Sequence, residues 1–265
     1  MEKEVLIKEI SGHVGTLKLN RPDRGNSLTL SMLAELHLVL TEWAENDSVR
    51  CVVITGNSEK AFSSGYDISA IPTELSPEAA ELLKTGNPLT LALDTVKNFP
   101  FPVIAMMNGY CFGAALNLAV CCDIRIGADH IKAGMPPAKL GIVYHPEGLS
   151  QFIEVVGMAK TREIFFTGRT YQGKEVQEMG LVDHLVPADS LSETVYAMAD
   201  EISKNAPLSL KGTKKILNMI GKYFLIGSEY LSDAQKLITE AFNSDDLKIG
   251  RAAFIEKRNP VFTGK

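Results

Sequence analysis

The segment GIVYHPEG, residues 141–148, places three side chains that can share or transfer protons within four residues: Tyr144, His145 and Glu147. An imidazole titrates near neutral pH, a desolvated carboxyl group can act as a general acid or base, and a phenol can donate or accept a hydrogen bond. This combination predicts proton transfer or the binding of a polar ligand. Each residue also has an ordinary alternative: a packed tyrosine with a satisfied hydroxyl group, a loop histidine bonded to backbone, and a solvated glutamate.

Two other segments are rich in small residues, which let backbone approach a ligand closely. AFSSGYDI (61–68) follows the apolar run CVVITG (51–56), and GYCFGAAL (109–116) follows PVIAMMNG (102–109) and opens a predicted helix. The first N–H groups of a helix lack an internal partner and lie at the positive end of its dipole. One N–H group from each loop can therefore form an oxyanion hole, which holds a developing negative charge. The alternative for such small residues is close helix packing.

The elements that must position these segments alternate between strands and helices, which indicates an α/β fold. Residues 4–20 alternate apolar and polar side chains around two glycines and predict a hairpin. Residues 28–46 have helical spacing, and CVVITG, PVIAMMNG and DIRIGA (123–128) each predict a short buried strand.

From about residue 158 the pattern is mostly helical. We therefore predict a core at residues 1–195 that contains the active site, followed by a helical C-terminal region at residues 196–265. One helix of that region carries a basic face that we expect to be solvated, formed by Lys211, Lys214 and Lys215.

The composition excludes several classes of function. The 265 residues suffice for one large domain or one domain with a small appendage, and the net charge of −5 argues against nucleic-acid or membrane-surface binding. The four cysteines lack the spacing of a metal site or a disulfide framework, so we expect buried reduced thiols and no metal. The charged N-terminal segment has no apolar signal core, and no long apolar run predicts a membrane span. We expect a cytoplasmic protein.

Taken together, the motifs resemble the crotonase (enoyl-CoA hydratase/isomerase) superfamily. The resemblance rests on the order and spacing of GNSLTLSML, AFSSGYDI, MNGYCFGAALNLAVCCDIRIGA and PPAKLGIVY. It continues through GLVDHLV, NAPLSLKGTKK and AFIEKRNPVFTGK, so it spans essentially the whole chain.

The resemblance implies a spiral of ββα turns with a helical C-terminal region that forms homotrimers, often dimers of trimers. It also implies an acyl-CoA substrate bound in the core region, with no cofactor beyond the coenzyme A moiety and no metal. In this superfamily two backbone N–H groups hold the thioester oxygen as an enolate forms. On this chain they correspond to Tyr66 and Ala114.

The resemblance also implies where coenzyme A binds. Arg24 is the candidate phosphate partner, and its alternative is an ordinary solvated loop arginine. Phe254 and Lys257 are candidates to reach the adenine bound by a neighbouring subunit. The residues expected along the 3′-phospho-ADP group, mostly through their backbone, are Arg24, Gly25, Ser64, Asp67 and Ile68.

The chain departs from the superfamily's hydratases at both of their catalytic glutamates. Asn117 stands one helical turn after the second oxyanion position, and Pro137 stands at the other site. Asparagine cannot act as a general base, and proline has no side-chain acid or base. Hydration by the usual route is therefore not expected. Asn117 can instead bind a polar group of the substrate, or merely fill space.

The segment YHPEG resembles other branches of the superfamily at two positions. His145 matches a position where dienoyl-CoA isomerases and aromatic acyl-CoA dehalogenases have a catalytic aspartate. Tyr144 matches a tyrosine of the methylmalonyl-CoA decarboxylase branch, which also lacks both glutamates but has a histidine where this chain has Tyr66. The leading hypothesis is decarboxylation of a malonyl-type acyl-CoA. The alternatives are an enoyl- or dienoyl-CoA hydratase or isomerase that uses His145 or Glu147, and a non-catalytic acyl-CoA-binding protein.

Overall fold

The computed structural model describes residues 4–45, 48–67, 87–222, 227 and 230–264. Within these residues a six-stranded sheet has the order β1-β2-β3-β5-β7-β10. Its β1 and β2 form the predicted antiparallel hairpin, and the remaining neighbours pair in parallel. The strands are β1 (Leu6–Ser11), β2 (Val14–Leu19), β3 (Cys51–Gly56), β5 (Val103–Met107), β7 (Ile124–Ala128) and β10 (His184–Val186).

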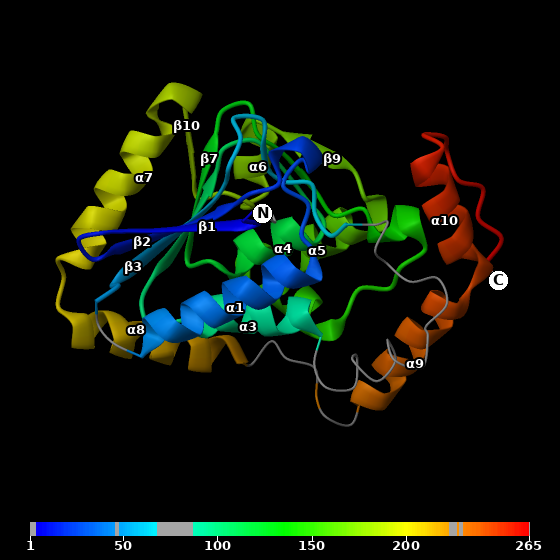
Figure 1. Ribbon diagram of the computed structural model, residues 1–265. Helices are drawn as coiled ribbons and strands as arrows, with labels where there is room; N and C mark the ends of the chain where they lie inside the picture. The colour runs from blue at the N-terminus through cyan, green and yellow to red at the C-terminus, as the bar shows by residue number, and fades with distance from the viewer. Residues whose placement is uncertain (1–3, 46–47, 68–86, 223–226, 228–229, 265) are drawn as a thin grey trace.

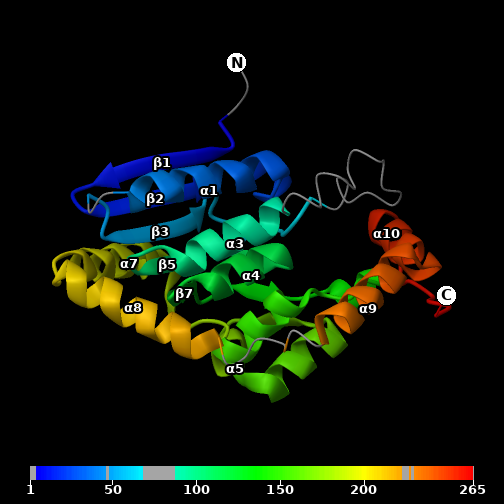
Figure 2. The same cartoon turned by 90° about the horizontal axis from the view of Figure 1, so that it is seen from below.

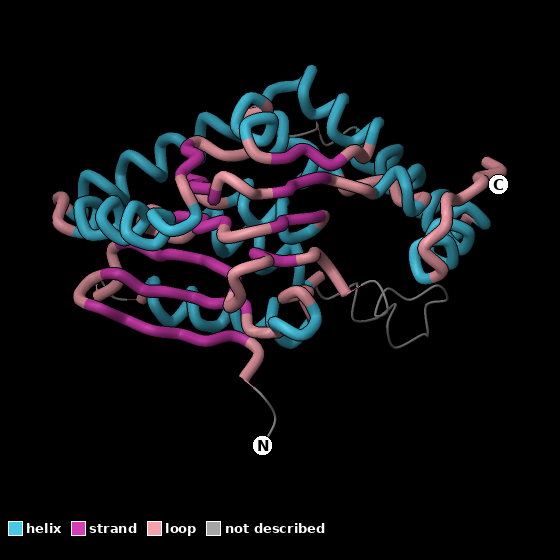
Figure 3. The backbone as a smooth tube through the Cα atoms, turned by 90° about the horizontal axis from the view of Figure 1, so that it is seen from above, coloured by secondary structure: helices cyan, strands magenta, loops and turns pink. Residues whose placement is uncertain are grey.

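A second sheet of shorter strands has the order β4-β6-β8-β9. The chain passes from one strand of the large sheet to one strand of the small sheet and then into a helix, three times in succession. This repetition confirms the predicted α/β spiral of ββα turns (Figure 3). The strands are β4 (Ala61–Ser63), β6 (Tyr110–Phe112), β8 (Lys132–Gly134) and β9 (Thr170–Gln172). The helices of the three turns are α3 (Pro88–Asn98), α4 (Ala114–Cys121) and α5 (Pro146–Thr167). The 3-10 helix η3 (Pro137–Leu140) directly precedes α5, and another 3-10 helix, η1 (Pro22–Arg24), lies between β2 and α1.

Helices cover both faces of the large sheet, and the strand residues are accordingly apolar on both sides. Along β3, Val52 and Ile54 join the core cluster that contains residues of α1, α3 and α4, whereas Cys51 and Val53 join the cluster that contains residues of α7. Figure 1 shows α1 and α3 on one side of the sheet and α7 on the other. Helix α1 spans Leu30–Ala44, and helix α7 spans Ala188–Ser203.

The part of the chain after residue 158 contains two short strands, β9 and β10, that its helical pattern did not predict. Three residues are too few for alternation of side chains to be recognised against helical neighbours. The predicted boundary between residues 195 and 196 falls inside α7, and the division into two regions stays a prediction. The remaining helices are α6 (Lys174–Glu178), α8 (Pro207–Gly221), α9 (Leu231–Asn243) and α10 (Asp245–Ile255).

Helices α9 and α10 lie at the end of the molecule away from the β1–β2 hairpin (Figures 1 and 2). Helix α10 packs tightly on η3: a Cβ atom built on Gly250 would lie 2.6 Å from the backbone of Leu140, and one on Gly141 would lie 2.7 Å from the backbone of Asp246. This contact joins the C-terminal helix to the segment that leads into Tyr144. Among the described residues, no helix is both long and apolar enough to cross a membrane.

The expectation that the three lysines of α8 form a solvated face is wrong for Lys214. Its side chain is 6% exposed, and its Nζ donates to Asp123 Oδ2 at 2.6 Å and to the Phe101 carbonyl oxygen at 3.0 Å. Asp123 also accepts from the Val103 N–H group at 2.7 Å. The lysine thus anchors α8 to the start of β5 by charge and hydrogen bonds, which an apolar periodicity cannot reveal.

We predict that Lys214→Ala lowers the free energy of unfolding by about 3 kcal/mol, because it leaves the partly buried carboxylate of Asp123 without its cation. Lys215→Ala on the exposed side of the same helix serves as the matched control and should change stability by less than about 0.5 kcal/mol. Urea unfolding of both variants checks this. Equal stability of the two would show that the ion pair does not hold α8 in place.

Candidate active site

The first loop of the site is fixed by a parallel bridge between Leu28 and Tyr66. The Leu28 N–H group donates to the Gly65 carbonyl oxygen at 2.8 Å, and the Asp67 N–H group donates to the Leu28 carbonyl oxygen at 3.0 Å. Because backbone groups alternate in direction along an extended chain, the N–H group of Tyr66 points away from Leu28. It donates no hydrogen bond within the described part of the chain.

The second loop ends at Gly113, the residue that precedes the first turn of α4. Gly113 has a φ of 55°, and its own N–H group donates to the Gly134 carbonyl oxygen at 3.0 Å. Ala114 follows as the first helical residue, and its N–H group also lacks an acceptor among the described residues. All eight residues of α4 are buried, so its positive end lies in a region of low water content.

Gly65 brings the two loops together. It has a φ of +96°, and a Cβ atom there would lie 2.6 Å from the Phe112 carbonyl oxygen and 3.6 Å from the Ala114 nitrogen. Any side chain would therefore separate the backbone before Tyr66 from the start of α4. Two unpaired N–H groups on neighbouring backbone segments, one of them at a helix start, can receive a negatively charged oxygen.

A chain of three polar side chains lies one helical turn beyond Ala114. Asn117 is fully buried, and its Oδ1 accepts from the Tyr144 hydroxyl group at 2.7 Å. Its Nδ2 donates to Gln151 Oε1 at 2.6 Å and contacts Cys121 Sγ at 3.8 Å. The structure therefore brings together two residues that the sequence nominated, Asn117 and Tyr144, and adds Gln151, which it did not.

The ring of Tyr144 fits against α5 because residue 148 is glycine. A Cβ atom on Gly148 would lie 2.4 Å from the Tyr144 ring and 2.9 Å from Asn117 Oδ1. The ring also packs against Phe165, with centroids 5.3 Å apart, and against His145, at 4.6 Å. Burial raises the pKa of the Tyr144 hydroxyl group well above its ordinary value, so the phenol stays neutral.

His145 forms the N-cap of α5. Its Nδ1 accepts from the Gly148 N–H group at 3.1 Å, and Glu147 Oε2 lies 3.4 Å from the same nitrogen. A nitrogen that accepts from an N–H group carries no proton, so the cap requires a neutral imidazole with its proton on Nε2. Burial lowers the pKa of His145, with Glu147 acting in the opposite direction. Nε2 is buried and has no partner within the described residues.

The residues predicted along the 3′-phospho-ADP group lie around the turn that follows η1. The Ser64 N–H group donates to the Gly25 carbonyl oxygen at 2.8 Å, and Ser64 Oγ donates to the Arg24 carbonyl oxygen at 3.4 Å. The side chains of Arg24 and Ser64 are exposed. The carboxylate of Asp67 accepts from Arg21 Nη1 at 3.2 Å, and Ile68 lies outside the described residues.

The two other predicted ligand residues lie at the C-terminal end of the chain. Phe254 is 58% exposed on α10, and Lys257 follows that helix with a φ of 54°. Pro137, at the position of a hydratase glutamate, is buried at the start of η3. Each of these roles stays a prediction.

Gln151 and Gly148 are the site residues that sequence reasoning missed. Both lie in the first turns of α5, which begins at Pro146, whereas the helical pattern was recognised only from about residue 158. The available signal was the proline itself, because proline is favoured at the first position of a helix. A helix that starts there places Gly148 and Gln151 three residues apart on one face.

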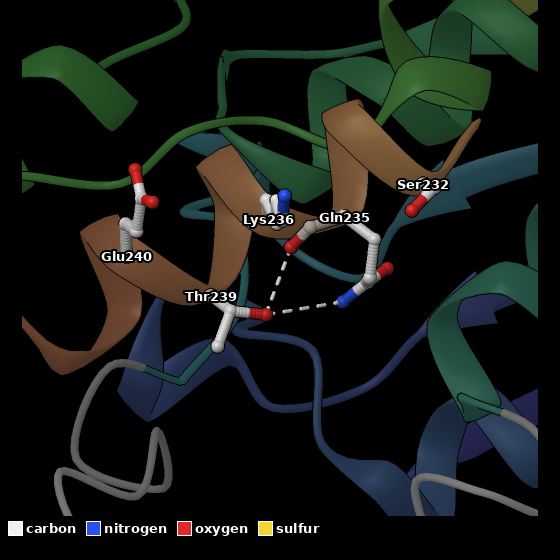
Figure 4. A pocket seen from close by; sticks show the side chains of 5 residues that line it. All are labelled: Ser232, Gln235, Lys236, Thr239 and Glu240. Atoms are coloured by element: carbon white, nitrogen blue, oxygen red, sulfur yellow. Dashed lines mark hydrogen bonds between the residues drawn. The ribbon is translucent and has the colours of Figure 1, made fainter. Parts of the chain in front are cut away.

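Figure 4 shows a pocket on α9. It is lined by polar and charged side chains, and Thr239 Oγ1 donates to the Gln235 carbonyl oxygen at 2.8 Å within it. It shares no residue with the site described above. The lining residues are Ser232, Gln235, Lys236, Thr239 and Glu240.

The chain is similar to known proteins over nearly its whole length. Residues 9–265 match the family model described as enoyl-CoA hydratase/isomerase. The chain is 34% identical over 265 residues to a probable enoyl-CoA hydratase, echA8, of Mycobacterium bovis, with 99% of each chain covered. It is 30% identical over 264 residues to a putative enoyl-CoA hydratase/isomerase, YngF, of Bacillus subtilis, with 100% of each covered. A solved structure of methylmalonyl-CoA decarboxylase with 2-nitronate-propionyl-CoA superposes with a TM-score of 0.90 at 25% identity, covering 99% of each chain.

The fold and the paired loops define an α/β enzyme of the spiral ββα type. The chain belongs to the enoyl-CoA hydratase/isomerase, or crotonase, family, whose enzymes act on acyl-CoA thioesters.

We predict that His145 makes the protein less stable in mild acid. Burial holds its pKa below the ordinary value of 6.5, so at lower pH the unfolded chain binds a proton that the folded chain excludes. The stabilising contribution of the neutral cap is complete above about pH 6.5 and is lost as the pH falls. His145→Asn keeps an N-capping side chain without titrating there. Relative to this variant, the wild type should lose unfolding free energy between about pH 6.5 and about pH 5, measured by urea unfolding.

The comparison with His145→Asn removes the contribution of the other histidines, which both proteins share. Parallel stability curves for the two proteins over this pH range would contradict the assigned cap.

Proposed function

We propose that this protein decarboxylates a malonyl-type acyl-CoA thioester. The observation that carries the proposal is the buried amide of Asn117, held between Tyr144 and Gln151 where hydratases of the family have a glutamate. An amide cannot take a proton from water, and Pro137 removes the second carboxylate. Decarboxylation needs neither, because the substrate itself supplies the electron pair.

The proposed reaction has two steps. The bond between the α-carbon and the carboxylate breaks, carbon dioxide leaves, and the electron pair forms a thioester enolate. The N–H groups of Tyr66 and Ala114 hold the enolate oxygen. A proton then returns to the α-carbon, and the neighbouring donors are the phenol of Tyr144 and the Nε2 proton of neutral His145.

The structural neighbour supports this assignment, since a methylmalonyl-CoA decarboxylase superposes over 99% of the chain with a TM-score of 0.90. The names of the sequence relatives favour a second candidate, hydration or double-bond isomerisation. Glu147 Oε2 lies 3.4 Å from His145 Nδ1, which places a carboxylate and an imidazole next to Tyr144, the groups that this candidate needs. Glu147 is about half exposed, with a relative side-chain exposure of 49%, and so is poorly desolvated for that work.

Binding and assembly complete the proposal. The turn formed by Arg24, Gly25, Ser64 and Asp67 receives the 3′-phospho-ADP group of coenzyme A, with no further cofactor and no metal. The assembly is a homotrimer or a dimer of trimers. Its support is the exposed apolar side of α8, where four side chains are each more than half exposed. These side chains are Ile216, Leu217, Met219 and Ile220.

The proposed location is the cytoplasm. Its support is that the four cysteines are free and buried, as expected in a reducing compartment.

Mass spectrometry of the products from a panel of thioesters tests the proposed function. The panel contains methylmalonyl-, malonyl-, glutaconyl-, crotonyl- and dienoyl-CoA. We expect loss of carbon dioxide from a carboxylated member and no water addition to crotonyl-CoA. Water addition or double-bond movement without decarboxylation would overturn the proposal in favour of the pair His145 and Glu147.

We predict that Ala114→Pro lowers kcat/KM by about 10²–10³-fold, because it deletes one N–H donor of the oxyanion hole. Proline is tolerated at the first position of a helix, and this N–H group makes no hydrogen bond among the described residues, so folding should persist. Ala114→Gly retains the donor and serves as the control. Wild-type turnover by a folded Ala114→Pro protein would remove Ala114 from the oxyanion hole.

A further inference from the structure

Each hydrogen bond that joins the side chains of Tyr144, Asn117 and Gln151 runs from a donor to an acceptor. In the structure the Tyr144 hydroxyl group donates to Asn117 Oδ1, and Asn117 Nδ2 donates to Gln151 Oε1. A phenol has a single proton. While that proton is given to Asn117, the phenol oxygen can only accept a hydrogen bond from a ligand.

The opposite direction uses the same three residues. If both amides turn over, Gln151 Nε2 donates to Asn117 Oδ1, and Asn117 Nδ2 donates to the phenol oxygen. The phenol proton of Tyr144 is then available to a ligand. Among the described residues the side chain of Gln151 makes no hydrogen bond other than the one to Asn117, so nothing else fixes the orientation of its amide.

A carboxylated substrate distinguishes the two directions, because an ionised carboxylate only accepts hydrogen bonds. The substrate carboxylate accepts a hydrogen bond from the phenol when donation runs from Gln151 through Asn117 to Tyr144. When donation runs from Tyr144 to Gln151, the carboxylate has no donor at the phenol. Gln151 is the last of the three hydrogen-bonded residues: it is 6% exposed and is joined to Tyr144 through Asn117.

We propose that Gln151 is a positioning residue that lets Tyr144 donate its hydroxyl proton to the substrate carboxylate, by reversing the hydrogen bonds through Asn117. The proposal rests on the proposed function, because it takes the acyl group to carry a carboxylate. It assigns a role to a residue that does not itself touch the substrate.

Gln151→Glu tests the direction of the chain with almost no change of shape. At about pH 9 the introduced carboxyl group is ionised, can only accept, and fixes the direction in which Tyr144 cannot donate. At about pH 6 a buried carboxyl group is protonated and can donate again. Relative to wild type, kcat/KM for the carboxylated substrate should fall by about tenfold to a hundredfold at about pH 9, the contribution of one hydrogen bond to a charged group, and recover at about pH 6.

The comparison with wild type at each pH removes the effect of groups that both proteins share. These titratable or charged groups come from α3, α4, α5 and the loop before α5. They are Asp94, Lys97, Cys121, Tyr144, His145, Glu147 and Glu154.

Two further variants separate this role from packing. Gln151→Met can neither donate to nor accept from Asn117, so the amide of Asn117 is free to turn over. The loss of kcat/KM should therefore be smaller than for Gln151→Glu and independent of pH. A purely structural role predicts the reverse order, because glutamate preserves the shape of glutamine. Gln235→Glu, the same substitution on exposed α9, is the matched control and should match wild type. Unchanged kinetics of Gln151→Glu at both pH values would overturn the proposal.

A binding measurement distinguishes failure of this proposal from failure of the proposed reaction. If wild type releases carbon dioxide and Gln151→Glu does so equally well, the reaction stands and the role of Gln151 fails. If wild type releases none, the proposed reaction fails, and calorimetry with succinyl-CoA and butyryl-CoA decides the role. Gln151→Glu at about pH 9 should weaken succinyl-CoA by about tenfold and leave butyryl-CoA unchanged. Equal weakening of both thioesters, or of neither, would overturn it.

Discussion

Two backbone segments approach each other at Gly65 so closely that no side chain fits between them, and the rest of the site depends on this approach. A Cβ atom there would lie 2.6 Å from the Phe112 carbonyl oxygen. Among the described residues the N–H groups of Tyr66 and Ala114 have no acceptor, because the bridge to Leu28 uses the opposite side of one segment and the other N–H group lies at a helix start. In the proposed site these donors are fixed in place by the backbone, ready for a negatively charged oxygen before any ligand arrives.

The spiral explains why these two segments are neighbours. In each turn the chain leaves the carboxyl end of a parallel strand of the large sheet and enters a strand of the small sheet. Because β4 and β6 pair with each other in the small sheet, the loops that follow them lie side by side. The same repetition places α4 and α5 in contact and brings Asn117 opposite Gln151. The proposed backbone site for an oxygen anion thus depends on sheet pairing, whereas the hydrogen-bonded side chains beside it depend on helix packing.

The sequence predicted the part of the molecule that local patterns encode. The hairpin, the strands β3, β5 and β7, helix α1 and the two glycine loops follow from periodicity and turn chemistry. The three-residue strands and the first turns of α5 could not be predicted in this way, because each of these segments is shorter than the window in which a period can be recognised. Burial of Lys214 and the bond between Asn117 and Gln151 depend on partners 91 and 34 residues away. Contacts of that range are set by the tertiary fold and leave no local pattern.

The glycine contacts between α10 and η3 have a practical consequence. Gly250 and Gly141 let the C-terminal helix rest directly on the backbone that leads into Tyr144. The last helix therefore acts as a template for a segment that is more than one hundred residues earlier in the chain. A tag or fusion partner attached to the C-terminus follows the helix that contacts this segment, while one attached before β1 is joined to the hairpin, away from α10. Preparations meant for kinetic work should therefore carry their tags at the N-terminus.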